Sequence, residues 1–240
     1  MSTRGDVPSE LVDTLAELTA SAPFTEDANE QALRARIRAE LSRRNPSLDA
    51  DPADGPSIAP ERPVNRLRQK HQHPRARSSM PRIEERLIAL GLTLPQPFKP
   101  PPGVVLPFQF VRVIGRRALI SGPAPQNPDG SLAAPRGKLG REVSIEQGYI
   151  AARLTALSIL GSLKRAVGDL DRIASWGRIF GMVNSAAGFN RQPSVINGFS
   201  DLILELYGPE TGAHSRSAVG LAELPWDIPI EIEGEVELVS

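Results

Sequence analysis

The stretch that decides the fold covers residues 214–237 and reads HSRSAVGLAELPWDIPIEIEGEVE. From Ile230 to Leu238 the chain alternates strictly: Ile230, Ile232, Val236 and Leu238 share one face, and glutamates occupy positions 231, 233, 235 and 237. A period of two is typical of a half-buried strand with one apolar face. The carboxylates on the other face repel one another unless cations, water or another subunit meets them.

A second strand precedes this one over residues 217–224, and residues 225–228 (PWDI) supply a turn. Together they predict an antiparallel hairpin. In its register Arg216 lies opposite roughly Glu237, and Glu231 lies about six residues farther along, on the order of 20 Å away at ~3.3 Å per residue. If Arg216 and Glu231 share a site, the register predicts that they meet across a subunit boundary and not within one chain.

Composition limits the classes of function. Lys and Arg balance Asp and Glu at 28 each, so no net field calls for a nucleic-acid or membrane partner. The absence of cysteine excludes disulfides, thiolate chemistry and cysteine-ligated metals. No apolar run approaches the roughly 20 residues of a membrane span, and the N-terminus lacks a signal-peptide core. We therefore expect a cytoplasmic protein with neither membrane nor nucleic-acid partners.

The chain divides near residue 80. Residues 1–79 are predicted to form a mostly disordered, low-complexity extension, with two short amphipathic helices and a linker that is poor in large apolar residues. Six basic residues between positions 62 and 77 are a candidate phosphate-binding arm or a solvated tail. The lack of interleaved aromatic residues favours the tail. Residues 80–240 are predicted to be a compact domain.

Periodicity predicts the elements of that domain. A short helix over residues 81–91 comes first, and a hairpin over 104–121 turns at Gly115. A Pro/Gly-rich loop leads to a helix capped by Ser144 and Gln147, which ends near Gly168. A strand (173–184), a helix (193–208) and the two closing strands complete a β-β-α-β-α-β-β order. Helices that are apolar on one side cover one face of a mixed sheet, so the fold class is α+β.

Several separated stretches of residues 80–240 resemble the RidA (YjgF) family, and in particular its branch named endoribonuclease L-PSP or chorismate-mutase-like. The stretches that carry the resemblance are Pro107-Phe108, Ile120-Ser-Gly122, Gly137-Lys-Leu-Gly140, Val183-Asn-Ser185, Val195-Ile-Asn197, and Arg216 with Glu231. The resemblance implies a chorismate-mutase-like fold with two main helices on one face of the sheet. It also implies a homotrimer with ligand clefts between subunits.

The resemblance implies that Arg216 and Glu231 carry the chemistry. A guanidinium offers a planar donor fork that fits a carboxylate bidentately, so Arg216 would hold a substrate carboxylate. Glu231 would position or polarise the attacking water. The alternatives are a structural ion pair between Arg216 and a nearby glutamate, and an ordinary exposed strand position for Glu231.

Five further residues would orient the substrate, namely Phe108, Ser121, Gly122, Asn197 and Ala218. Asn197 is alternatively a helix cap, and Ser121 a strand-end hydroxyl. The chain departs from the family pattern at three positions: Phe108 stands for a tyrosine, Ala218 for a cysteine and Pro123 for a glutamine. The loss of the tyrosine hydroxyl removes a group that could bond substrate or water.

The first functional hypothesis is a cofactor-free and metal-free deaminase, of the 2-iminobutanoate/2-iminopropanoate type. It would hydrolyse reactive 2-imino and 2-enamino acids to 2-keto acids and ammonia. The second hypothesis is a non-catalytic trimer that binds a small carboxylate as a sensor or regulatory module. RNA cleavage ranks third, because the domain lacks an evident His/Lys acid–base pair.

Overall fold

The computed structural model describes residues 82–239, so the predictions for residues 1–79 lie outside the described residues. The principal elements are α3 (Arg82–Ala89), β1 (Val111–Ile114), β2 (Arg117–Ile120), α4 (Ile145–Val167), β3 (Ile173–Asn184), α5 (Gln192–Gly212), β4 (Ser215–Leu221) and β5 (Ile230–Leu238). Two 3-10 turns, η2 (Leu170–Arg172) and η3 (Pro225–Asp227), precede β3 and β5. The predicted β-β-α-β-α-β-β order is confirmed, as is the α+β class.

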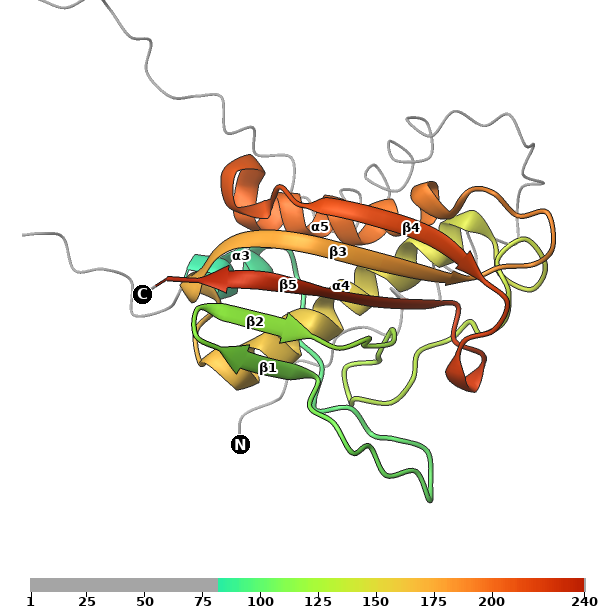
Figure 1. Ribbon diagram of the computed structural model, residues 1–240, viewed down its shortest axis with the longest axis horizontal. Helices are drawn as coiled ribbons and strands as arrows, with labels where there is room; N and C mark the ends of the chain where they lie inside the picture. Colours follow the sequence, from blue (N-terminus) through green and yellow to red (C-terminus); the bar gives the residue numbers. More distant parts are fainter. Residues whose placement is uncertain (1–81, 240) are drawn as a thin grey trace, which may run out of the picture.

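The strands form one mixed sheet in the order β1-β2-β5-β3-β4. β3 and β4 are parallel, and the other neighbours are antiparallel. Helices α4 and α5 lie behind the sheet in Figure 1 and cover one of its faces, while the other face is turned toward the viewer. The second face is called the open face below.

The helices form where the sequence predicts them. Ser144 and Gln147 make the expected capping box at the start of α4. The two helices approach closely, because a Cβ built on Gly198 of α5 would lie 1.9 Å from the carbonyl oxygen of Tyr149 in α4. Their apolar stripes and the facing strand residues are fully buried, including Ile159, Leu160, Leu163, Phe199, Leu202, Ile203, Ile179, Val183, Ile230 and Ile232. This core fixes which face of each strand points to the helices.

The predicted closing hairpin is wrong. β4 pairs in parallel with β3, and β5 pairs with the other edge of β3 and with β2, so β3 lies between the two closing strands. The reason is the connection through α5: a helix that links neighbouring strands of one sheet crosses over it and favours parallel pairing. The chain then needs a wide bend to reach β5, and Trp226 and Asp227 provide it with φ angles of 54° and 58°.

The predicted end of the second helix at Gly208 is confirmed: its φ of 74° and ψ of 175° are not helical, and the rest of α5, through Pro209 to Gly212, is a separate short turn. One boundary differs from the prediction. β4 begins at Ser215 and ends at Leu221, earlier than the predicted 217–224. Its earlier start includes Arg216 within the strand.

The open face carries the glutamates of β5. Two of them are paired, since Arg116 contacts Glu237 and Arg117 contacts Glu235 in ion pairs. Half-buried apolar side chains lie between the charged ones on this face: Leu119, Phe180, Met182 and Val219. The face is therefore neither a closed core nor a uniformly polar surface.

Candidate functional site

Arg216 lies on the helix-covered side of the sheet, at its β4 edge. In the pairing register it stands beside Ile179, which is fully buried under the helices. Its side chain reaches α5, where Nη2 donates to Asn197 Oδ1 at 2.6 Å and to the Pro193 carbonyl at 3.2 Å. Nη1 donates to Ser200 Oγ at 2.8 Å. Three oxygens of one helix thus hold the guanidinium.

The Ser200 hydroxyl also contacts His214, whose Nε2 lies 2.9 Å from Oγ. Arg216, Asn197, Ser200 and His214 are called the arginine cluster. Asn197 is not a helix cap, because Arg191 is the N-cap residue and Asn197 lies in the second turn of α5. Ala218 follows Arg216 by two residues in β4 and packs against the core on the same side.

Glu231 begins a second group, which lies on the open face. Its side chain lies against Gly122, where a built Cβ would be only 2.0 Å from Oε1. Burial raises the pKa of the Glu231 carboxyl, and the neighbouring charge of Glu233 raises it further. Glu231 is half-buried whereas Glu233 is exposed, so it is not an ordinary exposed strand glutamate. Glycine at position 122 is what leaves room for the carboxylate.

Ser121 ties this group to the segment before β1, because its Oγ donates to the Gln109 carbonyl at 2.9 Å and its N–H to the Phe110 carbonyl at 3.0 Å. The adjacent Phe108 is 52% exposed and packs edge-on against Phe110, with ring centroids 5.5 Å apart. Glu231, Gly122, Ser121 and Phe108 are called the glutamate cluster. Ser121 therefore fills the strand-end role that its sequence position allows.

The two clusters lie on opposite faces of the sheet. Arg216 aligns across β3 with Gly234, three residues from Glu231. Two strand spacings and three residues along the strand place the Cα atoms roughly 14 Å apart, shorter than the hairpin register implied. Arg216 points to α5 and Glu231 to the open face, so one chain does not bring the two side chains into one site.

The predicted site residues thus fall into the arginine cluster and the glutamate cluster, and they come from the stretches that carry the family resemblance. A sequence model of the family described as YjgF/chorismate mutase-like, putative endoribonuclease, matches residues 84–228. The chain belongs to this family. The match begins within α3, includes α4, α5 and both 3-10 turns, and ends just before β5.

Three similar proteins each match 65% of the chain. "Protein TCP17" of Trypanosoma cruzi is 37% identical over 157 residues, which are 65% of this chain and 94% of that protein. The crystal structure of Atu1372 from Agrobacterium tumefaciens is similar with a TM-score of 0.58 and 36% identity, over 65% of this chain and 92% of its own. A putative endoribonuclease from Shewanella oneidensis MR-1 gives 0.59 and 32%, over 65% and 99%.

Sequence reasoning missed Ser200 and His214. A signal existed for both. Ser200 follows Asn197 by three residues, which places the two side chains on one face of a helix. His214 precedes Arg216 by two, the spacing of side chains on one face of a strand. The helix spacing applied to Asn197 would have identified Ser200, and the strand spacing applied to Arg216 would have identified His214.

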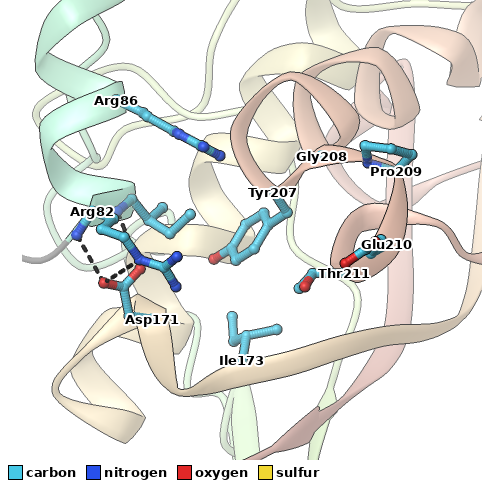
Figure 2. Close-up of a pocket in the computed structure, with 10 residues that line it drawn as sticks. Arg82, Arg86, Asp171, Ile173, Tyr207, Gly208, Pro209, Glu210 and Thr211 are labelled. Atoms are coloured by element: carbon cyan, nitrogen blue, oxygen red, sulfur yellow. Dashed lines mark hydrogen bonds and ion pairs between the residues drawn. The ribbon is translucent and has the colours of Figure 1, made fainter. Parts of the chain in front are cut away.

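A cavity of about 340 Å³ lies apart from both clusters, between α3 and the interrupted end of α5 (Figure 2). Its lining includes Arg82, Arg86, Asp171, Tyr207 and Glu210, and none of the predicted site residues. Asp171 accepts hydrogen bonds from the first two backbone amides of α3, and Arg86 donates to a carbonyl of α5. These contacts attach α3 to the domain.

Two further findings concern the part of the chain that the structure describes. Residues 82–239 contain no group of three or more histidine, aspartate or glutamate side chains placed to hold a metal ion. The helices in the same range include none with the length and apolar character needed to cross a membrane.

Proposed function

We propose that this chain hydrolyses 2-imino and 2-enamino acids to 2-keto acids and ammonia, without a cofactor. The observation that carries the proposal is the arginine cluster. Arg216 is held through both terminal nitrogens by Asn197, Ser200 and a backbone carbonyl. A guanidinium with a fixed plane loses little conformational freedom when it binds a planar carboxylate, so it suits a small 2-substituted acid.

The reaction needs a water molecule and a group that takes its proton. An enamino acid first tautomerises to the imine, and water adds to C2 of its protonated form, the iminium ion, while Glu231 takes one proton from that water. Glu231 returns this proton to the nitrogen of the carbinolamine. The C2–N bond then breaks, ammonia leaves, and the C2 hydroxyl gives its proton to Glu231 as the carbonyl forms; that proton finally passes to the released ammonia. The raised pKa of Glu231 supports this role, since a base is most effective when its pKa approaches the working pH.

The glutamate cluster supplies the surroundings of that water. Phe108 lies next to Gln109, whose carbonyl accepts from Ser121, and its exposed ring can contact the apolar part of the substrate. The substrates hydrolyse spontaneously, so a modest gain from positioning is enough for useful catalysis. The tyrosine hydroxyl of other family members is then dispensable for turnover in this chain.

The site needs two copies of the chain, and we propose a homotrimer in which the clusters of neighbouring subunits meet. Two features support this assembly. Arg216 and Glu231 of one chain point to opposite faces of the sheet, so a shared site takes one residue from each of two subunits. The half-buried apolar side chains of the open face also provide a contact surface, with Phe180 and Met182 among them.

RNA cleavage receives less support. An acid–base pair is required to move protons at a ribose and at the leaving oxygen. Between residues 82 and 239 the sequence has one histidine, His214, and both of its ring nitrogens lie within hydrogen-bond distance of a partner.

The test is ammonia release from freshly generated 2-aminoacrylate with the full chain and with Arg216→Lys. Lysine keeps the charge but loses the fork, so we expect kcat/KM to fall about 100-fold or more. Circular dichroism and Tm check that the variant is folded. If the parent chain does not accelerate the reaction, the proposed deaminase function is wrong. Saturable binding of pyruvate without turnover would then identify the second hypothesis, a carboxylate-binding module.

A further inference from the structure

The arginine cluster contains a chain of hydrogen bonds that the proposed reaction does not require. It runs from Arg216 Nη1 to Ser200 Oγ at 2.8 Å, from Oγ to His214 Nε2 at 2.9 Å, and from His214 Nδ1 to the Gly212 carbonyl at 2.8 Å. The Phe199 ring lies edge-on to the imidazole, with centroids 5.6 Å apart. The serine and the histidine therefore occupy defined positions behind the guanidinium.

The chemistry of the donors fixes the direction of two of the three bonds in this chain. The Gly212 carbonyl can only accept, so Nδ1 carries the imidazole proton. A guanidinium can only donate, so Ser200 Oγ accepts from Arg216. Nε2 of a neutral imidazole with its proton on Nδ1 accepts the hydroxyl proton of Ser200, whereas Nε2 of a charged imidazole would donate to Oγ. The direction of this bond therefore depends on the charge of His214.

The electrostatic surroundings favour the neutral imidazole, in which Nε2 accepts from Ser200. Burial lowers the pKa of His214, and the nearby positive charge of Arg216 lowers it too, against the opposing effect of the bond to the Gly212 carbonyl. A neutral imidazole avoids placing a second positive charge behind the guanidinium. It also leaves the lone pair of Nε2 available to Ser200.

We propose that Ser200 and His214 are positioning residues for Arg216. Neutral His214 orients the Ser200 hydroxyl, and the hydroxyl oxygen holds Nη1 so that the guanidinium plane faces the substrate carboxylate. The inference rests on the proposed function of Arg216 as the carboxylate-binding residue. When Ser200 or His214 is replaced, Nη2 still donates to Asn197 and Pro193, but Nη1 is no longer held in place. The guanidinium can then rotate about its Nη2 contacts.

The serine is tested by titrating the full chain with pyruvate, the product of 2-aminoacrylate hydrolysis, in a calorimeter. Ser200→Ala removes the acceptor, and we expect Kd to weaken about tenfold, as for a lost hydrogen bond to a charged group. Ser200→Thr keeps the hydroxyl and should recover most of the affinity. The control is Ser158→Ala: this buried serine of α4 bonds only its own helix at Leu154, and the variant should bind as the parent does.

The histidine is tested with two variants. His214→Phe keeps a ring but has no acceptor for Ser200, and should weaken pyruvate binding like Ser200→Ala. His214→Gln restores an acceptor at the position of Nε2 and should recover part of the affinity. If His214 had a purely structural role, Tm would fall in both variants and the two variants would have the same Kd for pyruvate. Equal Kd values for the phenylalanine and glutamine variants would overturn the proposal.

A crystal structure of His214→Phe separates this inference from the proposed function. We expect the guanidinium of Arg216 to leave the plane set by Asn197 and Ser200, whether or not the chain turns over 2-aminoacrylate. A guanidinium that keeps its orientation would overturn the positioning role. A reoriented guanidinium in the variant, together with a parent chain that neither binds pyruvate nor releases ammonia, would instead overturn the deaminase function and leave the positioning role intact.

Discussion

At the scale of single residues, β5 presents four glutamates that its alternating pattern alone does not distinguish. The structure separates them, because Glu231 lies against Gly122 while Glu235 and Glu237 pair with arginines. The difference comes from the segment after β2, which is more than a hundred residues away in the chain. A strand pattern can predict which face a side chain takes. It cannot predict which neighbour meets it there.

Gly122→Ala should remove the Glu231 carboxylate from its position while leaving the fold intact. The added methyl group would overlap Oε1, Cδ and Cγ of Glu231, at 2.0 to 2.6 Å, so the side chain must rotate away. We expect kcat/KM for 2-aminoacrylate to fall at least about tenfold, since a misplaced base loses its alignment with the attacking water.

The matched control is Gly177→Ala. Its added methyl group would also meet an open-face glutamate, Glu235, but at a milder 3.2 Å. It should change kcat/KM by less than about twofold if position alone matters for Glu231. Equal losses in the two variants would mean that crowding of the open face, and not the position of Glu231, lowers the rate.

His214 gives stability a pH dependence whose sign can be worked out. Its pKa is lowered from 6.5 in the folded chain, so between that lowered value and pH 6.5 the unfolded chain binds more protons. The free energy of unfolding therefore falls as pH decreases through this window. Chemical denaturation of the parent and of His214→Gln across pH 5 to 8 should show this component in the parent alone. An identical pH slope in both proteins would contradict it.

At the scale of elements, the sequence predicted the helices and strands but not how all the strands pair. The apolar stripe of α4 and its capping box are local signals, and both were confirmed. The β1–β2 hairpin around Gly115 was confirmed for the same reason. The β4–β5 hairpin failed because β3 has two edges, and the α5 crossover decides which one β4 takes. That choice depends on contacts between distant segments.

The attachment of α3 can be measured through Asp171, which accepts from the backbone amides of Arg82 and Ile83 at 2.8 and 3.3 Å (Figure 2). Asp171→Ala leaves these helix-start donors without that acceptor, and should lower the free energy of unfolding by about 1 kcal/mol in urea. Arg82→Ala breaks only the ion pair of an 80% exposed side chain, and should change it by less than about 0.5 kcal/mol. Equal losses would mean that the ion pair, and not the backbone contact, attaches the helix.

At the scale of the whole molecule, the sequence predicted that Arg216 and Glu231 do not meet within one chain, and the structure agrees for a different reason. The predicted cause was distance along a hairpin. The observed cause is that the two side chains leave opposite faces of the sheet, with β3 between their strands. The predicted register put Arg216 opposite Glu237, on the same face as Glu231, whereas the structure puts Arg216 on the helix-covered face.

Mixed assemblies test whether the site is shared. Arg216→Lys and Glu231→Gln are each expected to be inactive alone. When the two variants are unfolded, mixed in equal amounts and refolded together, some sites receive an intact arginine from one subunit and an intact glutamate from its neighbour. Random assembly into closed rings should recover roughly a quarter of the parent's ammonia release. No recovery, with mixed oligomers verified by native mass spectrometry, would place both residues of each site in one chain.

The space that Gly122 leaves for Glu231 also has a meaning for how such sequences can diverge. A side chain at position 122 and a carboxylate at position 231 exclude each other, because both would occupy the same volume. A lineage that gains a side chain at position 122 must therefore displace the carboxylate at position 231, so a replacement of Glu231 would have to come first if the displacement is harmful. A glycine at position 122 of a descendant sequence would then indicate that Glu231 still has room for its carboxylate in the position seen here.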